Sequence, residues 1–474
     1  MATTIIYISE PCYESHDPGI GAINLWGPQM RFFRSFIAFT LLILWLSFAS
    51  PRSRAQQPTT SILFDNVRVF TGKTLELSPP MHVLIKGEVI ADMSRDPIAA
   101  EPETIRIDGT GKVLMPGMID AHWHTFLAGS DISDVKAAED PVYLHLRSAA
   151  EAKATLLRGF TTVRDAGGPS FALKRVIDEG TLVGPRIYPS GALITQTGGH
   201  ADFRSRAQAN PQFGGAEPYS ESIGLSIIAD GPNQVLAAVR EQLRLGATQI
   251  KLTTTGGVAS DLDPIDGLQF TPEEIRAAVQ AASDWGTYVM VHNYTSDGAK
   301  RAIEAGVKCI EHGNLLDESA VKLAVEKGVW LDIQPFIKPY GKGPQFLKSS
   351  QVVAGTDNVY RLAKKYHAKI AWGTDLGGSF EKAAQQNDYL LRLTHWFTAP
   401  EILQMVTATN GELMALSGRR NTYPKKLGTI EQGAYADLLL VNGDPTADIN
   451  ILDKPDQNLL VIVKNGEIVK NIFE

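Results

Sequence analysis

Apolar and polar residues alternate near both ends of the chain, in the manner of half-buried strands. Residues 61–69 form one such run, and residues 81–93 form two runs joined by a Lys-Gly-Glu turn. The C-terminus has the same texture in residues 436–441 and 459–469, where a Lys-Asn-Gly turn predicts a hairpin. Strand-rich segments from opposite ends of a chain can share one sheet when the ends of the intervening domain lie close together. We therefore predict a small β-sandwich assembled from both chain ends.

The pattern changes in the middle of the chain, where short apolar runs alternate with amphipathic stretches of helical period. Residues 234–245 and 271–285 are such stretches, with Asp230 and Thr271 as candidate N-caps. This alternation is typical of parallel βαβ units. Eight parallel strands, each followed by a helix, close into a (β/α)8 TIM-like barrel whose working face is at the C-terminal ends of the strands. The eight candidate strands are 118–122, 160–164, 186–190, 248–252, 288–291, 308–311, 329–333 and 369–372.

The predicted fold class is thus α/β, with four segments along the chain. Residues 1–55 form a leader, 56–114 the first part of the β-sandwich, 115–424 the barrel and 425–474 the second part of the sandwich. The formal net charge of −7 is mild for 474 residues and no basic stripe occurs, so nucleic acid is not an expected partner. The chain has 2 cysteines and no Cys-x-x-Cys, which excludes a disulfide framework and a thiolate zinc site.

The N-terminal region carries a targeting signal. Arg31 and Arg34 precede an apolar run over residues 36–49, and small residues around Ala55 suit a signal peptidase. A membrane span needs about 20 apolar residues, so we expect a cleaved secretory signal rather than a retained anchor. The long mixed-charge stretch before the signal suggests that Met30 is the true start. We expect a secreted or periplasmic protein with no stable membrane association after cleavage near Ala55.

Candidate metal ligands stand at the ends of five of the predicted strands. Alternate residues of a strand point the same way, so His122 and His124 would aim two imidazoles at one point. Taken singly, a histidine at a strand end can merely cap a carbonyl, and an aspartate can cap the next helix. Six such residues at the mouth of one barrel are better explained as a metal site: His122, His124, Lys251, His292, His312 and Asp375.

Three further motifs accompany these residues: 114–122 (LMPGMIDAH), 159–165 (GFTTVRD) and 428–437 (GTIEQGAYAD). Together they resemble the amidohydrolase superfamily, and within it the imidazolonepropionase-like branch, which includes prolidase-like dipeptidases and ochratoxinase. The resemblance runs from about Asp65 to the C-terminus. It implies a metal-dependent hydrolase acting on a carbon–nitrogen bond.

The resemblance also implies a cofactor arrangement of two divalent ions, with zinc expected. By resemblance, His122, His124 and Asp375 hold one ion, and the other two histidines hold the second. Lys251 is implied to take up carbon dioxide and become N6-carboxylysine, an anionic bridge between the ions. A hydroxide shared by the two cations would attack the amide. Asp375 would accept the proton of the attacking water and pass it to the leaving amine.

Three further polar residues are candidates for substrate binding. His200 follows the third strand in a glycine-rich loop, and in relatives the matching histidine polarises the scissile carbonyl; the alternative is a solvated loop histidine. Tyr294 is a candidate second donor to the carbonyl or to a substrate carboxylate. Arg164 and Asp165 at the end of the second strand are interpreted first as an internal ion pair, although Arg164 could equally bind a substrate carboxylate.

Three functions are compatible with these residues. The leading hypothesis is a hydrolase that releases an amino acid from a small dipeptide or N-acyl amino acid, ochratoxin A being one candidate, and that forms a homo-oligomer. The alternative opens a cyclic amide, as imidazolonepropionase does, but many such relatives use one metal and no bridging lysine. A metal-free scaffold is disfavoured because all six ligands are retained. The sequence has no Walker loop, nucleophile elbow or dinucleotide fingerprint.

Overall fold

The computed structural model describes residues 61–260 and 262–473. The chain divides into two compact units, Met1–Pro58 and Thr59–Glu474, and all the described residues belong to the second unit. The predicted leader, its start at Met30 and its cleavage near Ala55 lie outside the described residues. The boundaries of the predicted domains stay predictions.

Strands from both ends of the chain share one eight-stranded sheet, as predicted. Its order is β18-β17-β16-β5-β1-β2-β3, with β4 paired to β1. The two chain ends meet where β16 runs antiparallel to β5, with Leu439 opposite Met115. A two-layered sandwich stays a prediction. The strands are β1 Ser61–Val69, β2 Met81–Lys86, β3 Val89–Ser94, β4 Ile105–Asp108, β5 Val113–Pro116, β16 Leu438–Val441, β17 Leu459–Lys464 and β18 Glu467–Asn471.

The middle of the chain forms two sheets in which the strands pair in parallel. A three-stranded sheet has the order β6-β7-β8, and a seven-stranded sheet has the order β10-β9-β11-β12-β13-β14-β15. Each of the eight predicted apolar runs overlaps one of these strands. They are β6 Met118–Trp123, β7 Phe160–Asp165, β8 Arg186–Tyr188, β9 Leu193–Thr195, β10 Ser226–Ile228, β11 Ile250–Thr253, β12 Val289–Thr295, β13 Cys309–Leu315, β14 Trp330–Asp332 and β15 Lys369–Ala371.

The break between the two parallel sheets falls inside the third predicted strand region. Strand β8 ends before Pro189, the chain bends through Gly191 at a φ of 73°, and it resumes as β9. Gly191 is required there, because a Cβ atom would lie 2.1 Å from Oε1 of Gln242. Backbone hydrogen bonds span the sheets: Thr248 N donates to Pro189 O at 2.8 Å, and Ala121 N donates to Trp372 O at 3.1 Å.

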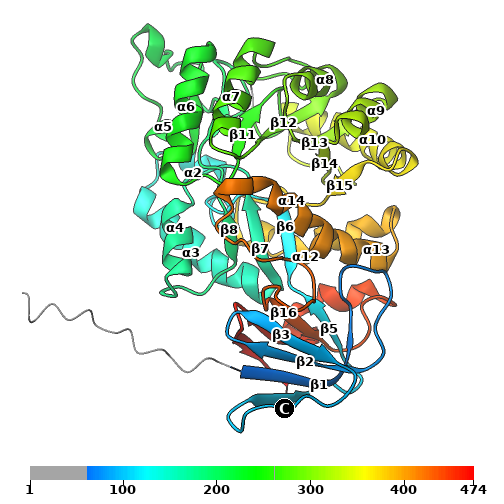
Figure 1. Ribbon diagram of the computed structural model, residues 1–474. Helices are drawn as coiled ribbons and strands as arrows, with labels where there is room; N and C mark the ends of the chain where they lie inside the picture. Colours follow the sequence, from blue (N-terminus) through cyan, green and yellow to red (C-terminus); the bar gives the residue numbers. More distant parts are fainter. Residues whose placement is uncertain (1–60, 261, 474) are drawn as a thin grey trace, which may run out of the picture. The chain divides into compact units, whose positions relative to one another are not determined.

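Helices lie around the outside of the parallel strands, while β1, β2, β3, β5 and β16 lie together below them (Figure 1). The α-helices are α2 Ile132–Lys136, α3 Pro141–Leu157, α4 Phe171–Asp178, α5 Tyr219–Ser222, α6 Pro232–Leu245, α7 Pro272–Asp284, α8 Ser296–Glu304, α9 Glu318–Lys327, α10 Pro344–Lys365, α11 Phe380–Ala383, α12 Gln386–Leu391, α13 Ala399–Gln404, α14 Asn410–Met414 and α15 Pro455–Asn458. Their apolar sides pack against the strands, as Val239 of α6 and Ile275 of α7 do in the largest core cluster.

One of the two predicted N-caps is confirmed and the other is wrong. Thr271 caps α7 and forms a capping box with Glu274. Helix α6 instead begins after Gly231, which has a φ of 83° and no capping side chain. Asp230 accepts hydrogen bonds from the backbone N and the hydroxyl of Thr197, so its carboxylate fastens a neighbouring loop.

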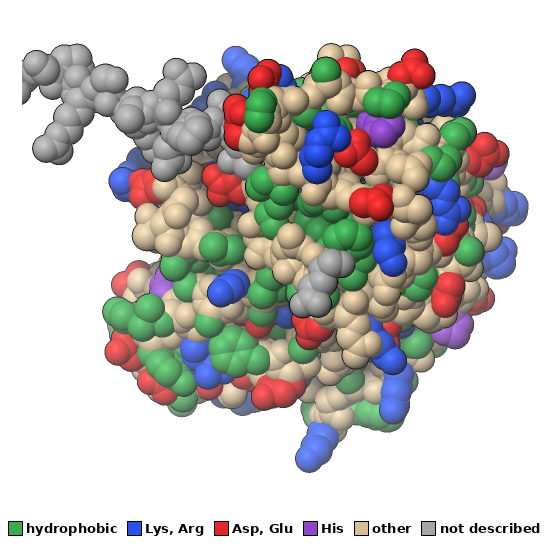
Figure 2. Space-filling view, turned by 90° about the horizontal axis from the view of Figure 1, so that it is seen from below, with side chains coloured by type: hydrophobic (Ala, Val, Ile, Leu, Met, Phe, Trp, Pro, Cys, Tyr) green, Lys and Arg blue, Asp and Glu red, His purple; other side chains and the backbone are tan. Residues whose placement is uncertain are grey.

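On the face of the molecule shown in Figure 2, lysine and arginine side chains are interspersed with acidic ones, so this face carries charges of both signs. Within the described residues, every helix is too short or too polar to span a bilayer.

Candidate active site

The six predicted ligands converge on one cavity. His122 belongs to β6, Lys251 to β11, His292 to β12 and His312 to β13, while His124 and Asp375 follow the ends of β6 and β15. All six side chains line a cavity of about 370 Å³, which His200 and Tyr294 also line. Parallel strands deliver their C-terminal ends to the same side of the sheet, which explains how residues far apart in sequence meet here.

Short distances join the donor atoms. Oδ1 of Asp375 lies 3.4 Å from Nε2 of His122 and 3.2 Å from Nε2 of His124. The amine nitrogen of Lys251 lies 3.4 Å from the same His122 Nε2. The ring centroid of His312 lies 4.9 Å from that of His122 and 4.5 Å from that of His292. One candidate metal group, His122, His312 and Asp375, has ligand atoms within 4.8 Å of one another.

Each of the four histidines has one ring nitrogen held by an oxygen acceptor. The acceptors are Glu311 Oε2 for His122 Nδ1 at 2.7 Å, Gly167 O for His124 Nδ1 at 3.2 Å, Gly256 O for His292 Nε2 at 3.2 Å, and Gln334 Oε1 for His312 Nδ1 at 2.7 Å. Carbonyl and carboxylate oxygens only accept, so the nitrogen that faces them carries the proton. In His122, His292 and His312 the other ring nitrogen then keeps its lone pair. This is how proteins orient metal-binding histidines, and the donor set fits divalent cations.

The protonation states of the donors also suit metal binding. Burial lowers the pKa of His122 to about 4, and burial is the first cause of the lowered pKa of His292 and His312. The pKa of Asp375 is lowered, because nearby His122 and His124 outweigh its burial. Neutral imidazoles and an ionised carboxylate are the forms that bind metals. His124 differs, since its hydrogen bond to Asp375 outweighs burial and raises its pKa.

Lys251 is almost completely buried, and burial lowers the pKa of its ammonium group. A buried lysine among histidines is costly as a cation and is easier to accommodate as a neutral amine. The neutral amine is also the form that can take up carbon dioxide.

Two ligands have backbone conformations that L-residues rarely adopt. His312 has a φ of 72° and Asp375 a φ of 56°. Such conformations typically cost about 1–3 kcal/mol and persist where the surrounding structure enforces them. The backbone N of Asp375 donates to His122 O at 2.8 Å, and Gly373 allows this approach because a Cβ atom there would lie 2.2 Å from His122 N. The strain is therefore built into the contact between the first and last ligand-bearing strands.

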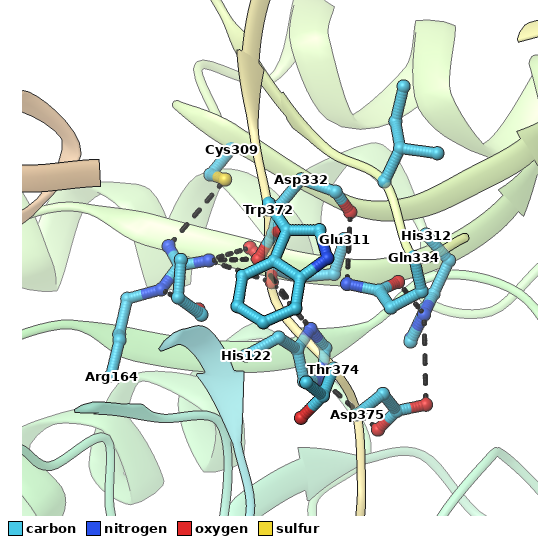
Figure 3. Close-up of polar contacts among 12 residues, drawn as sticks. His122, Arg164, Cys309, Glu311, His312, Asp332, Gln334, Trp372, Thr374 and Asp375 are labelled. Atoms are coloured by element: carbon cyan, nitrogen blue, oxygen red, sulfur yellow. Dashed lines mark hydrogen bonds and ion pairs between the residues drawn. The ribbon is translucent and has the colours of Figure 1, made fainter. Parts of the chain in front are cut away.

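A buried charge network supports His122 from below. Figure 3 shows the guanidinium of Arg164 facing the carboxylates of Glu311 and Asp332, with His122 beside them. Nη2 of Arg164 donates to Glu311 and to Asp332 at 2.8 Å, and its Nε donates to Ala121 O. His122, Glu311 and Asp332 also form a candidate metal group, but both carboxylates already bind the guanidinium of Arg164. We interpret this group as a support for His122.

Arg164 and Asp165 do not form the ion pair that the sequence suggested. Successive residues of a strand point to opposite faces, and here they enter different networks. The carboxylate of Asp165 accepts from Thr125 N at 2.8 Å and from the hydroxyl of Ser170 at 2.7 Å. Arg164 is fully buried and is not among the residues that line the cavity.

His200 and Tyr294 lie against the histidine ligands. The ring of His200 stacks on His292 with a centroid distance of 4.0 Å, and Tyr294 stacks on His312 at 4.9 Å. Nδ1 of His200 lies 2.5 Å from the hydroxyl of Ser260 and 3.2 Å from Asp263. These acceptors hold the ring with its other edge available to the cavity.

Residues that support the site were missed by sequence reasoning. Glu311, Gln334 and Asp263 each hold a histidine of the site. Glu311 carried a usable signal, because it is an acidic residue inside an apolar strand run, directly before His312. Gln334 and Asp263 carried no such signal in the sequence, because their partners lie on other strands or loops.

Known proteins are similar to this chain over most of its length. The amidohydrolase family matches residues 113–469. Ochratoxinase from Aspergillus niger is 30% identical over 403 residues, which cover 80% of this chain and 79% of that protein. Among solved structures, a prolidase in complex with N-methylphosphonate-L-proline has a TM-score of 0.79 and 33% identity, covering 87% of this chain and all of the other. A Xaa-Pro dipeptidase with bound methionine has a TM-score of 0.74 and 30% identity, with coverage of 87% and 100%.

The match spans every strand that carries a candidate ligand, and this family is generally metal-dependent. A cavity lined by an aspartate and by histidines whose ring nitrogens can bind a metal ion fits such a family. The chain belongs to the amidohydrolase family and is a hydrolase of carbon–nitrogen amide bonds.

Proposed function

We propose that this hydrolase cleaves the amide bond of a dipeptide or an N-acyl amino acid and releases a free amino acid. The observation that carries the proposal is the convergence of six donor residues on one cavity of about 370 Å³. A cavity of this size suits a small substrate rather than a folded protein. The similar proteins support the same class, since they include an ochratoxinase, a prolidase and a Xaa-Pro dipeptidase.

The proposal includes two divalent cations, zinc being the expected metal. His122, His124 and Asp375 would hold one, His292 and His312 the other, and Lys251 would join them as a carbamate. When bound, the cations supply Lewis acidity, which polarises an amide carbonyl and favours ionisation of water. The Lys251 amine lies 3.4 Å from His122 Nε2, which supports the proposal that the lysine and the histidines bind the same metal ions.

The residues of the chain then divide the work of hydrolysis. Water adds to the carbonyl carbon, the carbon–nitrogen bond breaks, and the amine must leave with a proton. Asp375 is placed to accept the proton of the attacking water and return it to the amine nitrogen. His200 and Tyr294 line the same cavity and are proposed to donate hydrogen bonds to the carbonyl oxygen, where negative charge develops. Arg164 supports this arrangement indirectly, through its hydrogen bond to Glu311.

We further propose that the two parallel sheets belong to one closed (β/α)8 barrel. The hydrogen bonds from Ala121 to Trp372 and from Thr248 to Pro189 support closure at both breaks. Secretion after removal of the leader and assembly into a homo-oligomer are also proposed.

A substrate panel tests the proposed function. The metal-loaded protein would be assayed with Xaa-Pro dipeptides, N-acyl amino acids and cyclic amides such as imidazolones, with mass-spectrometric identification of the products. We expect free amino acids from one of the first two classes. Turnover of the cyclic amides alone would contradict the proposal and favour the imidazolonepropionase-like alternative.

A further inference from the structure

A second chamber opens beside the cavity that holds the candidate ligands. Its volume is about 730 Å³, and the two hollows share Lys136 and Phe203 in their walls. The walls of the second chamber come from α2, from residues 202–208, from the start of α5 and from the start of α10. Helices α2 and α10 follow β6 and β14, and residues 202–208 follow β9, so the chamber lies on the ligand-bearing side of the sheets.

The chamber has cationic groups on partly apolar walls. Phe203, Tyr219 and Pro344 contribute apolar surface, while Lys136, Arg204 and Arg206 contribute positive charge. Arg204 is engaged, because Asp202 accepts hydrogen bonds from its Nε at 2.8 Å and its Nη2 at 2.6 Å. Arg206 is exposed and has no ion-pair partner among residues 61–260 and 262–473. Its guanidinium is therefore available to a carboxylate that enters the chamber.

We propose that this chamber binds an acidic group on the acyl half of the substrate, with Arg206 as the carboxylate partner. The inference rests on the proposed function and names its substrate class: N-acyl amino acids or dipeptides whose acyl half ends in a carboxylate. The carboxylate of the released amino acid is one carbon from the scissile nitrogen, so it stays in the cavity with the ligands. The acyl half, on the other side of the scissile bond, would extend past Phe203, where the two hollows meet, toward Arg206.

A matched pair of substrates tests the chamber. Glutaryl and glutaramoyl groups have nearly the same size, and only the first is anionic at neutral pH. Each would be attached to the amino acid that the substrate panel identifies, and kcat/KM would be measured with the metal-loaded protein. We expect the wild type to favour the glutaryl substrate by about fivefold, since an ion pair near solvent contributes modestly. The preference should shrink in 0.5 M salt, where the Debye length is a few ångströms.

Variants of Arg206 separate this inference from a general loss of activity. Arg206→Gln should remove the preference by raising the KM of the glutaryl substrate, with a much smaller effect on kcat. Arg206→Glu should reverse it in favour of an acyl half that ends in an amine. Arg361→Gln is the matched control, because Arg361 is an exposed arginine of α10 outside the walls of both hollows.

The outcomes distinguish the chamber from the proposed function. Equal wild-type turnover of the two substrates, or a preference that survives Arg206→Gln, would contradict the proposed role of the chamber. Neither result would affect the proposal that the protein is an amide hydrolase. If no substrate of the panel is hydrolysed, the proposed function fails. Calorimetric titration with glutarate then tests the chamber separately: binding that Arg206→Gln weakens supports it, and binding unaffected by the substitution rejects it.

Discussion

Nδ1 of His122 lies 2.7 Å from Oε2 of Glu311, and the same carboxylate receives Nη2 of Arg164 at 2.8 Å. Glu311 therefore holds the histidine ring on one side and is itself held by a guanidinium on the other. All three side chains are fully buried. The contact between Nδ1 and Glu311 orients the His122 ring, so that the lone pair of Nε2 points into the cavity.

This relationship predicts the effect of Glu311→Gln. The amide retains an oxygen acceptor for His122 but loses the negative charge that balances Arg164, so metal affinity should fall by about 10–100-fold. The metal-free protein should also be less stable by about 1–3 kcal/mol, because a buried charged group loses a partner. Competition with a fluorescent chelator and urea denaturation measure the two quantities.

Asp332→Asn is the control for that prediction. Oδ2 of Asp332 lies 3.9 Å from His122 Nδ1, beyond hydrogen-bond distance, although it accepts from Arg164. The asparagine keeps an oxygen for Arg164, so metal affinity should stay within about twofold of the wild type. A loss equal to that of Glu311→Gln would mean that the total charge of the network matters and the contact with His122 does not.

The number of bound metals is a second prediction. Five ligands and a bridging lysine are more than one tetrahedral ion needs, so the purified protein should hold close to two divalent ions per chain. Removal of the ions should lower the free energy of unfolding, by about 4 kcal/mol when free metal had stood at 1,000 times its Kd. Elemental mass spectrometry and thermal unfolding provide the readouts. A stoichiometry that stays at one after zinc or manganese supplementation contradicts the two-ion site.

Lys251→Ala should abolish activity and lower the metal content together, because it removes the proposed anionic bridge. Short carboxylic acids in bicarbonate-free buffer should restore part of both by replacing the lost anion. Lys327→Ala, at an exposed position of α9, should change neither. Near-normal activity of Lys251→Ala would remove the bridge from the mechanism.

Asp375→Asn tests whether this residue moves a proton as well as binding metal. Asparagine keeps the size and one ligand oxygen but cannot accept a proton at neutral pH. The variant should keep the fold and much of the metal while turnover falls by about 10²–10⁴-fold. The loss should be smaller for an ester analogue, whose leaving alkoxide needs protonation less than an amine does. Equal losses on amide and ester would leave Asp375 as a ligand only, and another group would have to carry the proton.

Much of the fold was predictable because its signals are local. Each of the eight strands coincides with an apolar run, and the ligands sit where those runs end, as with Lys251 in Ile250–Thr253. Asp230 looked like an N-cap by position alone, but the side chain is used by Thr197 in a loop that precedes it by 33 residues. Strands β9 and β10 were not predicted; both are 3 residues long and lie between the third and fourth predicted strands.

The supports of the site were not predictable for a related reason. An acidic residue in an apolar strand, such as Glu311, signals a buried partner, but the sequence does not identify that partner as an arginine 147 residues away. Arg164 and Asp165 show the same limit, since adjacent residues in sequence serve separate networks on opposite faces of β7.

The long excursion of the chain between β9 and β10 has an evolutionary consequence. Between β9 and β10 the chain leaves the sheet and supplies Phe203, Arg204 and Arg206 to the second chamber, while the six candidate metal ligands all lie elsewhere. Residues 203–225, which follow His200, can therefore diverge in length and charge without disturbing the ligand-bearing strands. A graft of this segment between relatives should transplant substrate preference and leave the hydrolytic machinery, His200 included, in place, so new specificities can arise here by loop exchange alone.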